Sequence, residues 1–147
     1  MRRKTAVAVR DARADDSAAI AGLLGELGYP TEAGAVRHRL DRLRRSRGSR
    51  VLAAVAGRSL VGVVGLHVMP LLHRDHGLCR ILALCVSRDY ARRGAGTRLM
   101  EAAESIARRA GCHRVELTTA QERIGAHKFY RSLGFERASI RFAKTLG

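Results

Sequence analysis

The chain has 147 residues, and 28 Lys and Arg against 13 Asp and Glu give it a formal charge of +15. This length fits one domain that buries most of its unfolded surface, so we expect residues 1–147 to form a single domain. No apolar run reaches the ~18 residues of a membrane span, and residues 1–16 lack the apolar core of a secretory signal, which predicts a cytoplasmic protein. Cys79, Cys85 and Cys112 lack metal-type spacing, so we expect them to be buried free thiols.

The first part of the chain predicts one strand and two helices. Residues 5–10 alternate like a short strand, and Asp15 or Asp16 is placed to cap a helix that ends at residues 28–30. A second helix is expected to begin at a Thr31 cap and to turn most of its arginines to solvent. The apolar stripes of the two helices are Ile20, Leu23, Leu24 and Leu27, and then Val36, Leu40 and Leu43.

The middle of the chain predicts three strands. Residues 51–56 and 60–68 read as an antiparallel hairpin closed at Gly57, and Gly62 and Gly65 predict a bulge or a close backbone approach. Residues 73–77 form a polar loop. The run 78–86 is apolar on nearly both faces after Arg80, which predicts a central strand that is covered on both sides.

The last part predicts a strand, helix, strand unit followed by a closing helix. A helix over 95–110 ends at Gly111, a strand follows over 113–118, and a further helix runs from 124 to 133. Residues 135–144 read as one or two closing strands. The whole pattern predicts an α/β domain with a mixed sheet.

A glycine turn lies between the central strand and the helix over 95–110. Gly94 and Gly96 allow a tight turn that aims unpaired N–H groups of the helix start at one point, where a phosphate is attracted by both donors and dipole. Arg92, Arg93 and Arg98 add positive charge. The turn is not a Walker loop and lacks the third glycine of a dinucleotide fingerprint, so a plain tight turn is the alternative on this evidence alone.

A second motif, AHKFYRSLGFERAS at 126–139, makes a family resemblance specific. A strand, a pyrophosphate-type R-x-x-G-x-G turn with its helix, and then A-x-x-F-Y-x-x-L-G-F resemble the GNAT superfamily of acyl-CoA-dependent N-acetyltransferases. The likeness extends to bacterial small-molecule acetyltransferases with an Arg-x-x-Ala-His-x-Phe-Tyr segment, matched by Arg123, Ala126, His127, Phe129 and Tyr130. It implies a GNAT-like, mostly antiparallel sheet flanked by helices.

The resemblance also implies a set of site residues and acetyl-CoA as cosubstrate, without a metal. The pantetheine-pairing strand falls on Leu84, Cys85 and Val86, Tyr130 takes the place of the usual acid, and Arg123 and Phe129 are further cofactor-binding candidates. The pyrophosphate loop and helix start fall on Ala91, Arg92, Arg93, Gly94, Ala95, Gly96 and Thr97. Ala91 departs from the usual Gln or Arg, which should weaken rather than abolish binding because backbone N–H groups hold much of the phosphate.

The implied chemistry is direct attack of an amine on the thioester, with a backbone N–H near Cys85 or Val86 for the oxyanion and Tyr130 to protonate the thiolate. Cys85 is expected to be structural, because it lies in an apolar strand without a visible activating partner. The family's common carboxylate on the central strand has no match over 80–84. The general base is therefore open among His67, which we rank first, and Asp75, His76 and Glu26.

Two other functions remain open from the sequence. The positive charge favours anionic partners in general, so a nucleic-acid-binding module that uses the basic second helix is one alternative, although three Phe, three Tyr and no Trp offer few stacking residues. An acyl-CoA sensor without turnover is the other. We expect a small-molecule (or peptide) amine as acceptor and no membrane partner, and a homodimer is an open alternative to a monomer.

Overall fold

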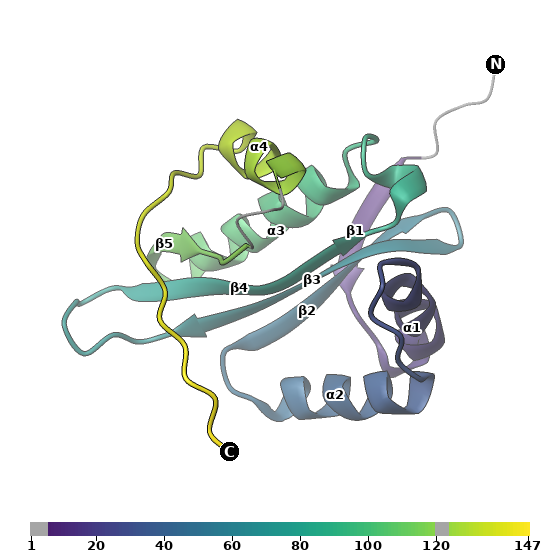
Figure 1. The fold of residues 1–147 in the computed structure, drawn as a ribbon, viewed down its shortest axis with the longest axis horizontal. Coiled ribbons are helices and arrows are strands. Elements are labelled where there is room, and N and C mark those ends of the chain that lie inside the picture. Colours follow the sequence, from purple (N-terminus) through teal and green to yellow (C-terminus); the bar gives the residue numbers. More distant parts are fainter. Residues whose placement is uncertain (1–5, 120–123) are drawn as a thin grey trace. The chain divides into compact units, whose positions relative to one another are not determined.

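A computed structural model of the chain describes residues 6–119 and 124–147 (Figure 1). The chain divides into two compact units, Met1–Leu117 and Thr118–Gly147, which are described separately. The first unit holds a sheet with helices on both of its faces, and the second holds one helix and the C-terminal segment. The expectation of one domain over residues 1–147 stays a prediction.

The sheet of the first unit has five strands in the order β1-β2-β3-β4-β5. The neighbouring pairs from β1 to β4 are antiparallel, while β4 and β5 are parallel because α3 (Ala95–Arg109) connects them. This confirms the predicted mixed, mostly antiparallel sheet. The strand bounds are β1 Val7–Asp11, β2 Ser49–Ala56, β3 Ser59–Met69, β4 Gly77–Val86 and β5 Cys112–Glu116.

Two helices cover one face of this sheet and α3 covers the other (Figure 1). Helix α1 (Ser17–Glu26), after a short 3-10 turn at Ala14–Asp16, and helix α2 (Ala33–Arg45) share one buried cluster with Ala53 and Val63. Opposite them, α3 buries Leu99 and Met100. Strand β3 serves both cores because successive side chains point to opposite faces: Val63 faces α1 and α2, and the fully buried side chains of Val64 and Leu66 lie on the α3 side.

The predicted caps of the first two helices are wrong in detail. Asp16 precedes α1 without a side-chain cap bond to it, because its carboxylate instead accepts two bonds from the Arg10 guanidinium and one from the Arg13 N–H. Glu32 takes the cap position of α2, and the Thr31 hydroxyl accepts from Arg39. The apolar stripes of both helices are confirmed, since Ile20, Leu23, Val36 and Leu40 are buried.

The two strand glycines lie where the ladders shift register. The β2–β3 pairing shifts next to Gly62, and the β3–β4 pairing shifts next to Gly65, so that Leu82 is an extra residue on β4. A Cβ on Gly62 would lie 3.1 Å from the Leu99 Cδ1 atom, which confirms a close approach. The prediction that β4 is covered on both faces is wrong at this bulge, where Leu82 is 50% exposed, since the buried cluster of α1 and α2 reaches Cys85 further along β4 and does not include Leu82.

The second unit holds α4 (Ile124–Ser132) and the segment after it. The Tyr130 ring contacts the Phe129 and Phe135 rings, with centroids 5.3 and 5.8 Å away. The predicted closing strands over 135–144 are wrong, since no residue there is in a strand. The alternation of Ile140 and Phe142 with Arg141 is typical of a strand, but a strand forms only when a neighbour completes its ladder, and this unit has none among its described residues.

No helix within residues 6–119 and 124–147 is long and apolar enough to cross a membrane.

Candidate active site

Strand β4 has an open backbone edge along its second half. Strand β5 pairs with β4 only from Gly77 to Arg80, and the last rung joins Arg80 to Glu116. Beyond Arg80, strand β4 continues to Val86 and is paired there only with β3, on its other side. The sheet therefore parts between β4 and β5, and residues 81–86 present an edge that β5 does not fill.

The direction of the backbone groups on this edge follows from one hydrogen bond. The Ser87 N–H donates to the Val61 oxygen at 2.8 Å, so it points to β3. Backbone groups of successive strand residues point to opposite sides, which turns the N–H groups of Val86 and Leu84 to the open side. The N–H of Cys85 points to β3, and its side chain packs against the α1 and α2 cluster. Of the three predicted pantetheine-pairing residues, Leu84 and Val86 thus offer donors to the opening.

The glycine turn directly follows this edge and forms the start of α3. Gly94 is the N-cap residue of the helix and adopts a left-handed conformation with φ +83°. The first intrahelical bond runs from the Arg98 N–H to the Gly94 oxygen, so the N–H groups of Ala95, Gly96 and Thr97 have no acceptor within the helix. A helix of 15 residues adds the positive end of its dipole at this point.

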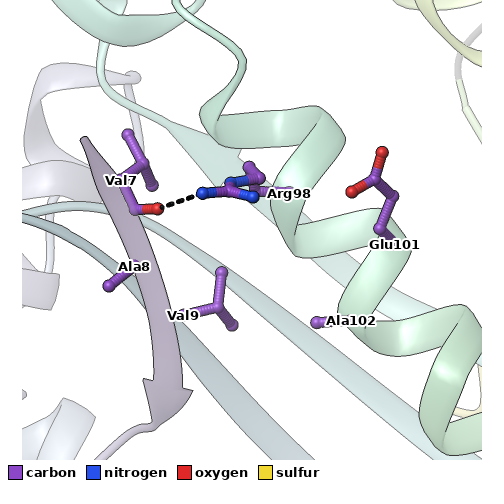
Figure 2. Close-up of a pocket in the computed structure, with 6 residues that line it drawn as sticks. All are labelled: Val7, Ala8, Val9, Arg98, Glu101 and Ala102. Atoms are coloured by element: carbon purple, nitrogen blue, oxygen red, sulfur yellow. Dashed lines mark hydrogen bonds between the residues drawn. The ribbon is translucent and has the colours of Figure 1, made fainter. Parts of the chain in front are cut away.

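The arginines near the turn are used in different ways. Arg92 and Arg93 are exposed, and the Arg93 guanidinium lies over the Tyr90 ring at 5.2 Å from the centroid. Arg98 differs from the expectation, because its guanidinium donates to the Val7 oxygen of β1 at 3.1 Å (Figure 2). It belongs to a cleft of about 380 Å³ between β1 and α3 that contains none of the predicted site residues. Ala91, at the departure from the family pattern, is exposed.

Glu26 connects α1 to the segment that leads into the turn. One of its carboxylate oxygens accepts from the Arg88 N–H at 2.9 Å and from the Ser87 hydroxyl at 3.4 Å. This links the C-terminal end of α1 to the end of β4, two segments about sixty residues apart in the chain. Glu26, one of the alternative candidates for the base, therefore has a visible role in holding the turn.

His67 lies near the end of β3 in a short chain of hydroxyl groups. Its Nδ1 is 2.8 Å from the Ser49 hydroxyl, which donates in turn to the Ser46 hydroxyl at 3.1 Å. On the other side its register partner is Arg80, which is next to the parting of the sheet. His76, an alternative candidate, instead packs its ring edge-on against His113 at 4.0 Å. His67 is thus the candidate histidine that the strand register brings closest to the opening.

Cys79 and Cys112 do not fit a nucleophilic role, while the structural role expected for Cys85 stays a prediction. Burial raises the pKa of the Cys79 thiol to about 11, with a smaller contribution from Cys112, and burial also raises the pKa of Cys112. Nucleophilic cysteines need the opposite shift. None of the three cysteines forms a disulfide within the described chain.

Three predicted site residues fall beyond the first unit. Tyr130 and Phe129 lie on α4, and we describe them only within the second unit. Arg123 lies outside the described residues. Their roles stay predictions.

Sequence reasoning missed a charged group at the last rung between β4 and β5. The Arg80 guanidinium donates to Glu116 at 3.2 Å, and the Arg114 guanidinium pairs with the other oxygen of Glu116 at 3.1 Å. The only signal in the sequence was an arginine within an otherwise apolar strand. The partners of that arginine are more than thirty residues away, and only the parallel register brings them together.

The open strand edge followed by a phosphate-type helix start is the arrangement expected for an acyl-CoA-dependent acetyltransferase. The sequence model of the Acetyltransferase (GNAT) family matches residues 18–135, and the chain belongs to this family.

Individual relatives agree with this assignment. An aminoalkylphosphonate N-acetyltransferase of Salmonella typhimurium is 33% identical over 93 residues, which cover 63% of this chain. The match spans 60% of the length of that relative.

Solved structures share the fold at lower identity. A GNAT family acetyltransferase of Staphylococcus aureus superposes with a TM-score of 0.81 at 21% identity, over 95% of this chain and 98% of that one. A transcriptional regulator of Bacillus halodurans reaches a TM-score of 0.86 at 21% identity, over 96% of this chain and all of the other.

Proposed function

We propose that the protein transfers an acetyl group from acetyl-CoA to an amine of a small molecule. The observation that carries this proposal is the open edge of β4, which runs directly into a helix start whose first N–H groups have no acceptor within the helix. Family membership supports the same reaction. The proposal assigns the pyrophosphate to the N–H groups of residues 95–97 and the pantetheine arm to the open edge.

The dimensions of the edge suit an extended arm. At about 3.3 Å per residue, the stretch from Val86 to Ile81 measures about 17 Å. An arm held at the turn and extended along this edge exchanges hydrogen bonds first with Val86 and then with Leu84. It brings the thioester toward the Leu82 bulge and the rung of Arg80.

The chemical step is a direct attack of the amine nitrogen on the thioester carbonyl. A backbone N–H of the open edge stabilises the oxyanion, and Tyr130 protonates the departing thiolate. An amine with a pKa near 10.4 costs about 4 to 5 kcal/mol to hold neutral at pH 7, so a base is useful. His67 fits this role through water, because Ser49 holds its Nδ1 and fixes the direction of its ring.

Calorimetric titration with acetyl-CoA tests the cofactor assignment. We expect binding by the wild type, after any copurified CoA has been removed, and weaker binding by Arg93→Glu and Gly96→Pro. Proline at position 96 lies in the first turn of α3, where it breaks no intrahelical hydrogen bond but removes one donor. Arg108→Glu, at the far end of α3, is the matched charge control and should bind like the wild type.

The outcomes separate the proposal from its alternatives. Absence of wild-type binding would overturn the cofactor assignment and leave nucleic acid as the partner to test. Binding without transfer to any amine would favour an acyl-CoA sensor. The name of the Salmonella relative makes aminoalkylphosphonates a rational first class in the acceptor screen. Full turnover by Tyr130→Phe would remove the acid role, and an unchanged pH profile in His67→Ala would remove the base role.

A further inference from the structure

Three charged side chains stand together where the sheet parts. Arg80 and Glu116 are paired residues of β4 and β5, and Arg114 precedes Glu116 by two positions, so all three side chains lie on one face of the sheet. This is the face opposite α3. The neighbouring β4 residue Cys79 is fully buried, and its register partner Val68 lies on the same face of β3 as Gly62, which approaches Leu99 of α3. We call these three residues the rung cluster.

The rung cluster has more donors than its single carboxylate uses. Each guanidinium has five N–H donors. Arg80 donates one of them to Glu116, and Arg114 forms an ion pair with the same carboxylate. The formal charges sum to +1, since two arginines face one glutamate. The side chains of Arg80, Arg114 and Glu116 are 47%, 58% and 35% exposed, so a ligand from solvent reaches them.

Stability alone gives little reason for this cluster. Ion pairs that are this exposed contribute about 0 to 1 kcal/mol, and an arginine in a central strand replaces an apolar side chain that would pack there. A planar guanidinium whose orientation is fixed by one carboxylate can, however, donate its remaining N–H groups to a second oxyanion. Two guanidinium groups thus face one carboxylate, and no other acceptor for them is found among the described residues.

The cluster also lies at a useful place for the proposed reaction. Arg80 is two residues before Leu82, whose Cβ faces Gly65 on the same face of the sheet and which is half exposed at the bulge. The other register neighbour of Arg80 is His67. A small molecule bound at the cluster therefore lies beside both the proposed base and the thioester end of the open edge.

We propose that Arg80 and Arg114 bind an anionic group of the acceptor, so that the acceptor is an amine that also carries a phosphonate, phosphate or carboxylate. This inference rests on the proposed function for the word acceptor, but the anion site itself is independent of turnover. Glu116 orients the two guanidinium groups and limits their combined charge.

The test measures binding and transfer separately. Calorimetry with the 147-residue chain, with and without CoA, compares 2-aminoethylphosphonate, β-alanine and propylamine, which differ in carrying a phosphonate, a carboxylate or no anion. We expect tighter binding of the two anionic amines than of propylamine, with a difference that shrinks as salt is added. Acetyl transfer to the same three amines is measured in parallel.

The variants give results of opposite sign. Arg80→Gln and Arg114→Gln should each weaken binding of an anionic amine about tenfold, which is typical of one lost charge-assisted hydrogen bond. Glu116→Gln should tighten it, because it removes the competing carboxylate. Arg108→Gln removes an arginine on α3 that is also exposed and paired with a glutamate, and it should change nothing. The affinity for acetyl-CoA should be the same in all four variants.

Several results would overturn the inference. One is equal wild-type affinity for all three amines, and another is a loss of anionic-amine affinity in Arg80→Gln that Arg108→Gln matches. A third is a loss of affinity in Glu116→Gln as large as that in Arg80→Gln, which would indicate an ion pair that only supports the strands. Failure of the proposed function looks different: anionic amines bind and respond to the variants as expected, but none is acetylated. The phosphonate and carboxylate arms show which anion the site prefers.

Discussion

The left-handed Gly94 at the start of α3 allows a sharp test of the turn. Its φ of +83° is a conformation that costs an L-residue about 1 to 2 kcal/mol, and a Cβ there would meet no atom within 4 Å. Gly94→Ala should therefore lose about 1 to 2 kcal/mol of unfolding free energy from the backbone alone, or about 2 to 8 °C in Tm. Gly94→Asn should lose less, because asparagine tolerates this conformation better.

The matched control is Gly22→Ala in α1. Gly22 also has open space around its Cβ position but lies in a helix interior, so the same substitution should stabilise the protein by about 0.5 to 1 kcal/mol. Urea unfolding followed by circular dichroism measures both changes. Equal effects of alanine at positions 22 and 94, or no cost at 94, would refute the left-handed turn and with it the proposed aim of the N–H groups.

Further predictions concern stability and the turn. Asp16→Asn should cost about 1 to 3 kcal/mol at pH 7, since three hydrogen bonds depend on the carboxylate. The Arg10 hydrogen bond lowers the pKa of Asp16 below its ordinary value of 3.8. The stability that Asp16 contributes is therefore present above pH 3.8 and disappears as the pH falls through the folded-state pKa, which acid titrations of the wild type and Asp16→Asn would reveal. Cys79 should resist alkylation at pH 8 until the protein is unfolded, which mass spectrometry can check. The free energy of unfolding should also fall between pH 9 and 11, because the thiol of the unfolded chain ionises at a lower pH than the buried thiol. Leu99→Ala should cost about 2 to 5 kcal/mol in urea unfolding, because the side chain is fully buried. Glu26→Ala should weaken acetyl-CoA binding in calorimetry with little change in Tm, since the exposed carboxylate holds only the segment before the turn.

Much of the fold was predictable because the signals are local. The hairpin of β2 and β3 followed from two apolar runs around Gly57, and α3 followed from its apolar stripe and the glycine after it. Helix caps were less predictable. Asp16 and Thr31 are good cap residues, but Arg10 and Arg39, six and eight residues away, bind their oxygens in the structure.

The closing strands over 135–144 show a further limit of local signals. An alternating pattern indicates which face a segment would bury, but a strand also needs a neighbour for its hydrogen bonds. No sequence pattern states whether that neighbour is present.

For the candidate site, the sequence by itself determined the tight glycine turn before α3, because glycine spacing is a local property, and the family resemblance supplied Leu84 and Val86 as candidate residues. Only the tertiary structure decided that β5 ends at Glu116 and opens the β4 edge, and that Arg80, Arg114 and Glu116 meet at the last rung. The physical reason is that strand register depends on how α3 packs and where a bulge inserts one residue. Both are set by contacts between segments far apart in the chain.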